Sequence, residues 1–147
     1  MPVTSTCDDT SRKDIMTLLP DELIALLGGN AVCYLATTMP DGSPQLTQTW
    51  CDTDESHILI NTVNTHQKAR NVVRDPRVAV TIFDPVRPSG YFAVRGRVIN
   101  TSTEGAADHI EALAQRYLGG PYPWWGGRDQ TRLLLTIEAD RVRGQGL

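Results

Sequence analysis

The feature that most constrains this chain is a series of short runs rich in β-branched and aromatic residues, separated by turn signals at hairpin spacing. An Asp-Gly pair at Asp41 and Gly42 marks the turn between the first two runs, and a polar turn at residues 52–56 precedes the third. Antiparallel strands can join through such short turns, whereas parallel strands need long crossovers. We therefore predict a mainly β protein on an antiparallel sheet, with strands at residues 31–38, 45–51, 57–62, 77–83, 91–100 and 132–140.

Three helical segments interrupt these strands. Residues 20–27 begin with a proline and end before two glycines, as a short helix does, and this helix should cover one end of the sheet. Residues 66–74 have a polar, helix-like pattern that ends before a proline. The longest helix is expected to run from a cap at Ser102 or Thr103 to Leu118. Short strands with helices inserted late favour an antiparallel barrel over a doubly wound parallel sheet.

Size and charge exclude several classes of protein. A chain of 147 residues predicts one domain, over residues 17–147, after a flexible tail at residues 1–16. A formal net charge of −3 argues against a general affinity for nucleic acid or an anionic membrane. No apolar run approaches the roughly 20 residues that span a bilayer, and the start lacks the layout of a signal peptide. We therefore expect a cytoplasmic protein.

The cysteines and histidines form no metal-ligand pattern. The three cysteines are an odd number without close spacing, so we expect reduced thiols at Cys7, Cys33 and Cys51, with Cys33 in the core. No metal site is expected either, because the histidines lie far apart in the sequence, at His57, His66 and His109. The chain also lacks the short motifs of serine hydrolases, zinc proteases, P-loop enzymes and dinucleotide-binding folds.

One basic segment is a candidate anion site. Residues 66–71 follow a strand and begin a helix, so free backbone N–H groups and cationic side chains can converge on one anion. Lys68 would supply a point charge and either His66 or Arg70 a second contact. Asn71 would hold the loop or reach the ligand. A solvated basic helix face explains the same composition, and such faces are common.

An aromatic loop at residues 119–127 is the second unusual feature. Trp124 and Trp125 stand between glycines and prolines, and two adjacent tryptophans cannot both face a small core. We expect this loop to meet a partner subunit or a pocket wall. Trp50 and Tyr91 are assigned to the same substrate pocket or dimer interface.

Several segments together resemble the pyridoxamine-phosphate-oxidase-like split β-barrel superfamily, and more narrowly its branch that uses the deazaflavin coenzyme F420. The resemblance spans about residues 20–140, and it depends on the joint spacing of residues 35–38 (LATT), 41–45 (DGSPQ), 68–72 (KARNV) and 74–77 (RDPR). It implies a six- to seven-stranded antiparallel split barrel with short flanking helices. It also implies a homodimer with the cofactor at the subunit interface.

The resemblance also implies which residues hold the cofactor. In that family the phosphate lies on the basic segment, which corresponds to Lys68 with Asn71 in support. His66 would help there, although family members often have arginine at its position. The ring system would contact polar side chains of the second and third strands, namely Gln45, Thr47, Gln48, Asn61 and Thr62. For each of these five residues, the alternative to a cofactor contact is an ordinary polar position on the outward face of a strand.

The function implied by the resemblance is an F420-dependent reductase that transfers a hydride from the deazaflavin to a conjugated small-molecule electron acceptor. No catalytic side chain is expected, because the ring performs the redox chemistry. Two alternatives stay open, an FMN-dependent oxidase or reductase and a non-catalytic protein that binds F420, flavin or haem. We expect the loops at residues 84–90 and 119–127 to shape the acceptor pocket.

Overall fold

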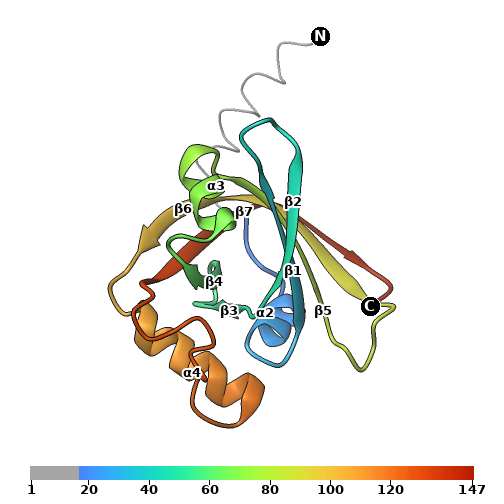
Figure 1. Ribbon diagram of the computed structural model, residues 1–147. Coiled ribbons are helices and arrows are strands. Elements are labelled where there is room, and N and C mark those ends of the chain that lie inside the picture. The colour runs from blue at the N-terminus through green and yellow to red at the C-terminus, as the bar shows by residue number, and fades with distance from the viewer. Residues whose placement is uncertain (1–16) are drawn as a thin grey trace.

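The computed structural model describes residues 17–147, and the expected tail at residues 1–16 lies outside the described residues. The sheet order is β2-β1-β5-β6-β7-β4-β3, and every neighbouring pair is antiparallel. This sheet curls around its inner face and stays open between its edge strands β2 and β3 (Figure 1). The expected mainly β split barrel is therefore confirmed. Its elements are α2 (Asp21–Leu27), β1 (Val32–Thr38), β2 (Pro44–Thr49), β3 (Asp52–Thr53), β4 (Ile58–Val63), α3 (Gln67–Arg74), β5 (Arg77–Phe83), β6 (Tyr91–Ser102), α4 (Ala106–Leu118) and β7 (Arg132–Gln145).

Strand pairing differs from the expectation at the third predicted strand. β2 pairs with β1 alone, whereas β4 pairs with β3 and β7. β3 occupies part of the expected polar turn, where Asp52 and Thr53 pair with Leu59 and Ile58. β4 is buried at five of its six positions, so it needs a strand on both sides. Hairpin spacing alone could not reveal this pairing, because β7 comes from the far end of the chain.

The start of α4 also differs from the expected cap. Ser102 ends β6, and its hydroxyl accepts a hydrogen bond from the Glu104 N–H (3.1 Å), which closes a turn before the helix. α4 begins after Gly105, whose φ of 76° favours glycine. β6 and β7 are longer than predicted because they pair with each other along most of their length.

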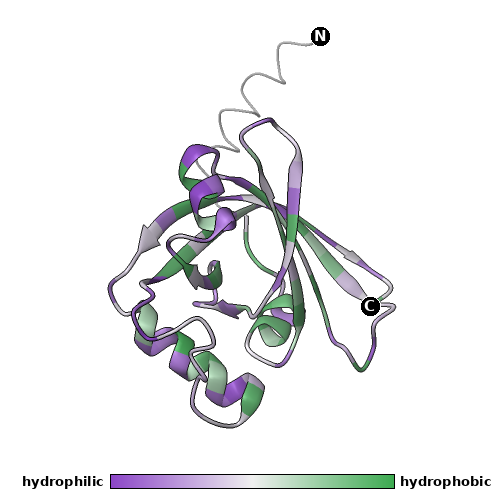
Figure 2. Ribbon diagram, viewed as in Figure 1, coloured by the Kyte–Doolittle hydropathy of each residue, from purple (hydrophilic) through white to green (hydrophobic). Residues whose placement is uncertain are grey.

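The core lies inside the curl of the sheet. Leu23 and Leu27 of α2 are fully buried against it, so α2 covers one end of the barrel as expected. α2 is mostly hydrophobic, whereas α3 is mostly hydrophilic (Figure 2). Each fully buried leucine or isoleucine contributes roughly 1.5–3 kcal/mol to folding. Cys33 lies in this core with Cys51, and both thiols are free, while Cys7 lies outside the described residues.

The other two helices flank the sheet. α3 packs against β1 and β4, and α4 packs against β4 and β7. Asn71 fastens α3 to the barrel because its fully buried amide donates to the Thr37 hydroxyl (3.0 Å) and its oxygen accepts from Gln67 (2.8 Å). Within residues 17–147, no helix is long and apolar enough to cross a membrane.

Candidate functional site

A pocket of about 310 Å³ lies where β2 and β4 meet the start of α3, the aromatic loop and the first residue of β7. It brings together five of the predicted cofactor residues, Gln48, Asn61, Thr62, His66 and Lys68. Two of the predicted aromatic residues also line it, Trp50 and Trp125. The remaining lining residues are Thr49, Ile110, Tyr122 and Arg132.

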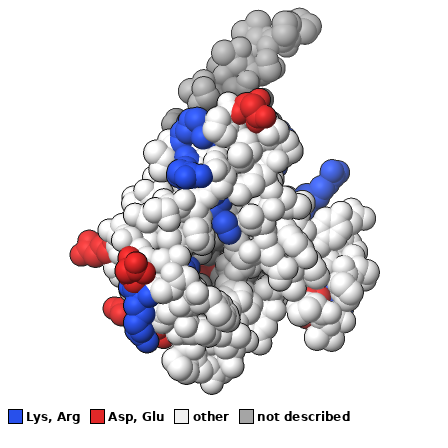
Figure 3. Space-filling model, in the orientation of Figure 1, with Lys and Arg blue, Asp and Glu red and all other residues white. Residues whose placement is uncertain are grey.

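The pocket is basic, although the chain as a whole is acidic. Its lining contains Lys68, Arg132 and His66 and no carboxylate, and the ion pairs among the described residues include neither Lys68 nor Arg132. Lys and Arg side chains gather over α3 and reach the hollowed middle of this face (Figure 3). An anion entering this space would meet two cations that no described carboxylate neutralises.

The pKa values of the three basic groups in the pocket are all lowered. Burial lowers the pKa of Lys68, and the charge of Arg132 lowers it further. Burial also lowers the pKa of His66, and the charges of Lys68 and Arg132 add to that effect. Burial lowers the pKa of Arg132 as well. A bound anion would oppose all three shifts, because it favours the charged form of each group.

Arg132 lines the pocket, and the sequence analysis did not select it as a candidate site residue. It stands at the first position of β7 beside Val63, and only 8% of it is exposed. Its Nε donates to Asn61 Oδ1 (2.8 Å), and its Nη1 donates to the Tyr122 hydroxyl (3.3 Å). Asn61 therefore holds a cation in the pocket. The only sequence signal was a lone arginine at the start of an otherwise apolar strand.

Two buried hydroxyl groups in the pocket wall lack a hydrogen-bond partner among the described residues. These are the Oγ1 atoms of Thr49 and Thr62, and Thr62 is only 3% exposed. A buried polar group without a partner costs about 1–3 kcal/mol. Such groups are typical of walls that receive a polar ligand or ordered water.

Aromatic rings form the opposite wall. Trp50 stacks on Tyr117 with ring centroids 5.1 Å apart, and Trp125 meets Trp50 edge-on at 6.4 Å. The loop is fastened to α4 because the Tyr122 N–H and the Trp124 indole N–H donate to the Glu111 carboxylate, at 3.1 Å and 2.8 Å. These bonds lower the pKa of Glu111. Tyr122 and Trp125 of the aromatic loop line this pocket.

Known proteins identify the fold family. Residues 19–146 match the family described as pyridoxamine 5'-phosphate oxidase. The chain belongs to the pyridoxamine 5'-phosphate oxidase family. This result confirms the superfamily expected from the sequence, whose members are largely oxidoreductases that bind flavin-type cofactors.

Solved structures agree with this family assignment. A protein named F420 reductase is 27% identical with a TM-score of 0.74, over 85% of this chain and 98% of that protein. A conserved hypothetical protein from Mycobacterium tuberculosis is 25% identical with a TM-score of 0.69, over 88% and 86% of the two chains. A putative pyridoxamine 5'-phosphate oxidase from Listeria innocua, 20% identical with a TM-score of 0.64 over 84% and 95% of the chains, shares the fold.

Other predicted site residues of this pyridoxamine 5'-phosphate oxidase family member do not line the pocket. Gln45 accepts a hydrogen bond from the Thr37 hydroxyl (2.8 Å), and Asn71 fastens α3, so both connect elements behind the pocket. Thr47 shares a face of β2 with Thr49 but is not a lining residue, and Tyr91 pairs with Phe83 at the far end of β6. Also outside the lining are Trp124, which bonds Glu111, and Arg70.

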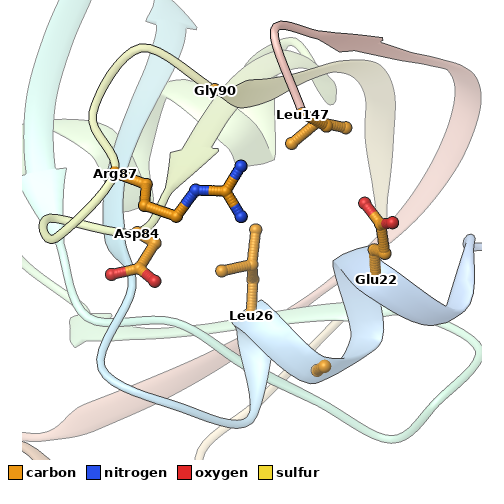
Figure 4. Close-up of a pocket in the computed structure, with 7 residues that line it drawn as sticks. Glu22, Leu26, Asp84, Arg87, Gly90 and Leu147 are labelled. Atoms are coloured by element: carbon orange, nitrogen blue, oxygen red, sulfur yellow. The ribbon is translucent and has the colours of Figure 1, made fainter.

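The loop at residues 84–90 borders a different pocket of the pyridoxamine 5'-phosphate oxidase fold. This second pocket, of about 420 Å³, lies between α2 and the loop, with Arg87 and Leu26 pointing into it from opposite sides (Figure 4). The loop at residues 84–90 does not line the 310 Å³ pocket of the same chain, because it follows β5 at the end of the barrel that α2 covers.

Proposed function

We propose that this protein is a reductase that binds F420 in the 310 Å³ pocket and reduces a conjugated small molecule. The observation that carries the proposal is a pair of cations, the half-buried Lys68 and the buried Arg132, which no described carboxylate neutralises and which share the pocket with a wall of aromatic rings. This combination suits a ligand with a phosphate and a flat conjugated ring. The similarity to a protein named F420 reductase, over nearly its whole length, supports the choice of cofactor.

Each group of pocket residues has a role in this proposal. Lys68 and Arg132 hold the phosphate through charge-assisted hydrogen bonds. The unpartnered hydroxyls of Thr49 and Thr62, with the Gln48 amide, offer hydrogen bonds to the polar edge of the cofactor. The aromatic wall excludes water from the reacting ring. When bound, the reduced deazaflavin supplies the hydride, and no side chain is needed as a nucleophile.

A second copy of the chain completes the site in this proposal. A pocket of about 310 Å³ is at the lower end of the range for ligand pockets, so it holds only part of a cofactor of this size. The outer face of β1, β2 and β6 exposes Tyr34, Leu46 and Tyr91, and Tyr34 stacks on Phe83 (6.3 Å). Exposed apolar surface of this kind is typical of an interface. Light scattering that finds a monomer would contradict the homodimer.

FMN is the alternative cofactor, because it offers a phosphate and a conjugated ring to the same residues. A side-by-side titration of the protein with F420 and FMN, followed by fluorescence polarisation, separates the two. We expect micromolar or tighter binding of F420 and weaker binding of FMN. The reverse order would assign the protein to the flavin branch, and no binding of either would refute the proposed site. Tight binding without turnover of any conjugated acceptor would instead indicate a carrier.

The affinity for F420 is expected to rise as the pH falls from about 8 to about 5.5, the range in which histidines titrate. Burial and the neighbouring charges lower the pKa of His66 in the free protein, and a bound phosphate raises it. Binding therefore takes up a proton, so the affinity is higher below the pKa of the complex than above it. His66→Gln should flatten this pH dependence. His57 lies outside the pocket, so His57→Gln should leave the pH dependence unchanged.

A further inference from the structure

A chain of hydrogen bonds behind the pocket ends at Arg132. The Asn61 amide contacts Arg132 Nε (2.8 Å), the Ala106 carbonyl (2.8 Å) and His109 Nδ1 (3.0 Å). His109 Nε2 in turn contacts Asp52 Oδ2 (2.9 Å). The chain thus connects β3, α4, β4 and β7, and nothing in the sequence singled out His109 for such a role.

Elementary chemistry fixes the direction of every bond in this chain. An arginine Nε–H only donates and a carbonyl oxygen only accepts, so Asn61 must turn Oδ1 to Arg132 and Nδ2 to Ala106. The same Nδ2 faces His109 Nδ1, which must therefore accept. The proton of the imidazole then lies on Nε2 and is donated to Asp52.

Asp52 is suited to hold this tautomer. Burial raises the pKa of its carboxyl, but the hydrogen bond from His109, the Thr53 N–H and the charge of Arg116 together bring it below its ordinary value. Arg116 also donates to Asp52 Oδ1 (3.2 Å) and to the Cys51 carbonyl, so the carboxylate is held from a second side. A carboxylate that orients a histidine in this way is a common arrangement around functional groups.

We propose that His109 is a positioning residue that fixes the guanidinium of Arg132 in the pocket through Asn61. The proposal rests on the proposed function, because Arg132 is assigned there to the phosphate. An arginine side chain carries about 2 kcal/mol of rotamer entropy, so a preorganised guanidinium binds an anion more tightly than a free one. Without an acceptor at His109, the Asn61 amide loses one of the two contacts that hold its oxygen towards Arg132, and only the bond to the Ala106 carbonyl remains.

Two substitutions of His109 separate positioning from a merely structural role. Asparagine places its side-chain oxygen near the position of Nδ1, where it accepts from Asn61. Glutamine places its amide near Nε2, where it reaches Asp52 but leaves Asn61 with the Ala106 carbonyl as its one remaining acceptor. We expect F420 affinity within about threefold of the wild type for His109→Asn and roughly tenfold weaker for His109→Gln, the loss of one net hydrogen bond. Equal affinities in the two variants would overturn the proposal.

A matched control and a variant at the chain's outer end complete the binding experiment. His57 forms a similar pair with Asp54 (3.0 Å) outside the pocket, so His57→Gln should leave the affinity unchanged. Asp52 lies on the partly exposed strand β3 and holds the tautomer of His109. We expect Asp52→Ala, which removes this carboxylate, to weaken F420 binding by about threefold. Unchanged binding in Asp52→Ala would contradict the proposal even if neither His109 variant folds.

A measurement without any ligand distinguishes failure of this inference from failure of the proposed function. The NMR signal of the Arg132 Nε–H, identified by its loss in Arg132→Met, reports the bond to Asn61. It should persist in His109→Asn and shift or broaden in His109→Gln. If the wild type binds neither F420 nor FMN, the proposed function fails while this signal still tests the positioning. A signal unchanged in His109→Gln would overturn the role of His109.

Discussion

A variant carrying both Lys68→Met and Arg132→Met is expected to bind F420 at least about 100-fold more weakly than the wild type. A hydrogen bond to a charged group is worth about 1.5–3 kcal/mol, so two of them correspond to roughly 3–6 kcal/mol. The two side chains share one pocket, and the effects of neighbouring residues do not add fully. We therefore expect a loss of binding free energy near the lower end of this range. Fluorescence polarisation of F420 measures the loss, and circular dichroism verifies the fold.

A control variant that loses the same number of positive charges distinguishes direct contact with F420 from a general electrostatic effect. Arg70→Met with Arg141→Met removes two positive charges from exposed positions outside the pocket. We expect this control to bind F420 within about threefold of the wild type, because exposed charges are screened. If the control lost as much affinity as the pocket variant, the net charge of the protein would explain binding and the phosphate assignment would be refuted.

Gly96→Ala is expected to destabilise the fold by about 3 kcal/mol, the upper part of the usual range for overpacking. Gly96 lies at a register shift between β6 and β7, and an added Cβ would lie against the Glu138 carbonyl oxygen and only 3.1 Å from its carbon. The contacting atoms are backbone of a paired strand, so they cannot move without breaking the ladder. Urea unfolding followed by circular dichroism should show the midpoint fall.

The chain offers a matched control for this prediction. At Gly120 an added Cβ meets no atom within 4 Å, and the backbone there is not left-handed. Gly120→Ala should therefore leave stability unchanged or raise it by up to about 1 kcal/mol, since alanine restricts the unfolded chain. An equal loss in both variants would mean that the close approach of β6 and β7 does not limit the residue at position 96.

The strands and helices were largely predictable because their signals are local. The run at residues 77–83 matches β5 in full, and the polar pattern before Asp75 matches α3 to within one residue. The pairing of β4 was not predictable in the same way. Its residues alternate too little to choose a neighbour, and its partner β7 lies at the other end of the chain. A capping residue was also assigned wrongly, since Ser102 closes a turn before α4 begins.

The candidate site was predictable where one segment carries it. Lys68 and His66 both line the pocket, as their place at the start of a helix after a strand suggested. Asn61 also lines the pocket, and its amide holds Arg132. Gln45 and Asn71 stand on the right segments, and their side chains connect elements behind the pocket, a difference that side-chain direction in the folded barrel decides.

The sequence by itself determined the local elements of this protein: the alternation of its strands, its turns, its helix ends and a cationic segment at the start of α3. Tertiary structure alone decided which distant residues share the pocket. Pairing of β4 with β7 sets Arg132 beside Val63, where it contacts Asn61 and shares the pocket with Lys68, and the docking of α4 brings His109 to Asn61. Local patterns report which face of an element is buried, whereas a site depends on which elements are neighbours, and long-range packing settles that.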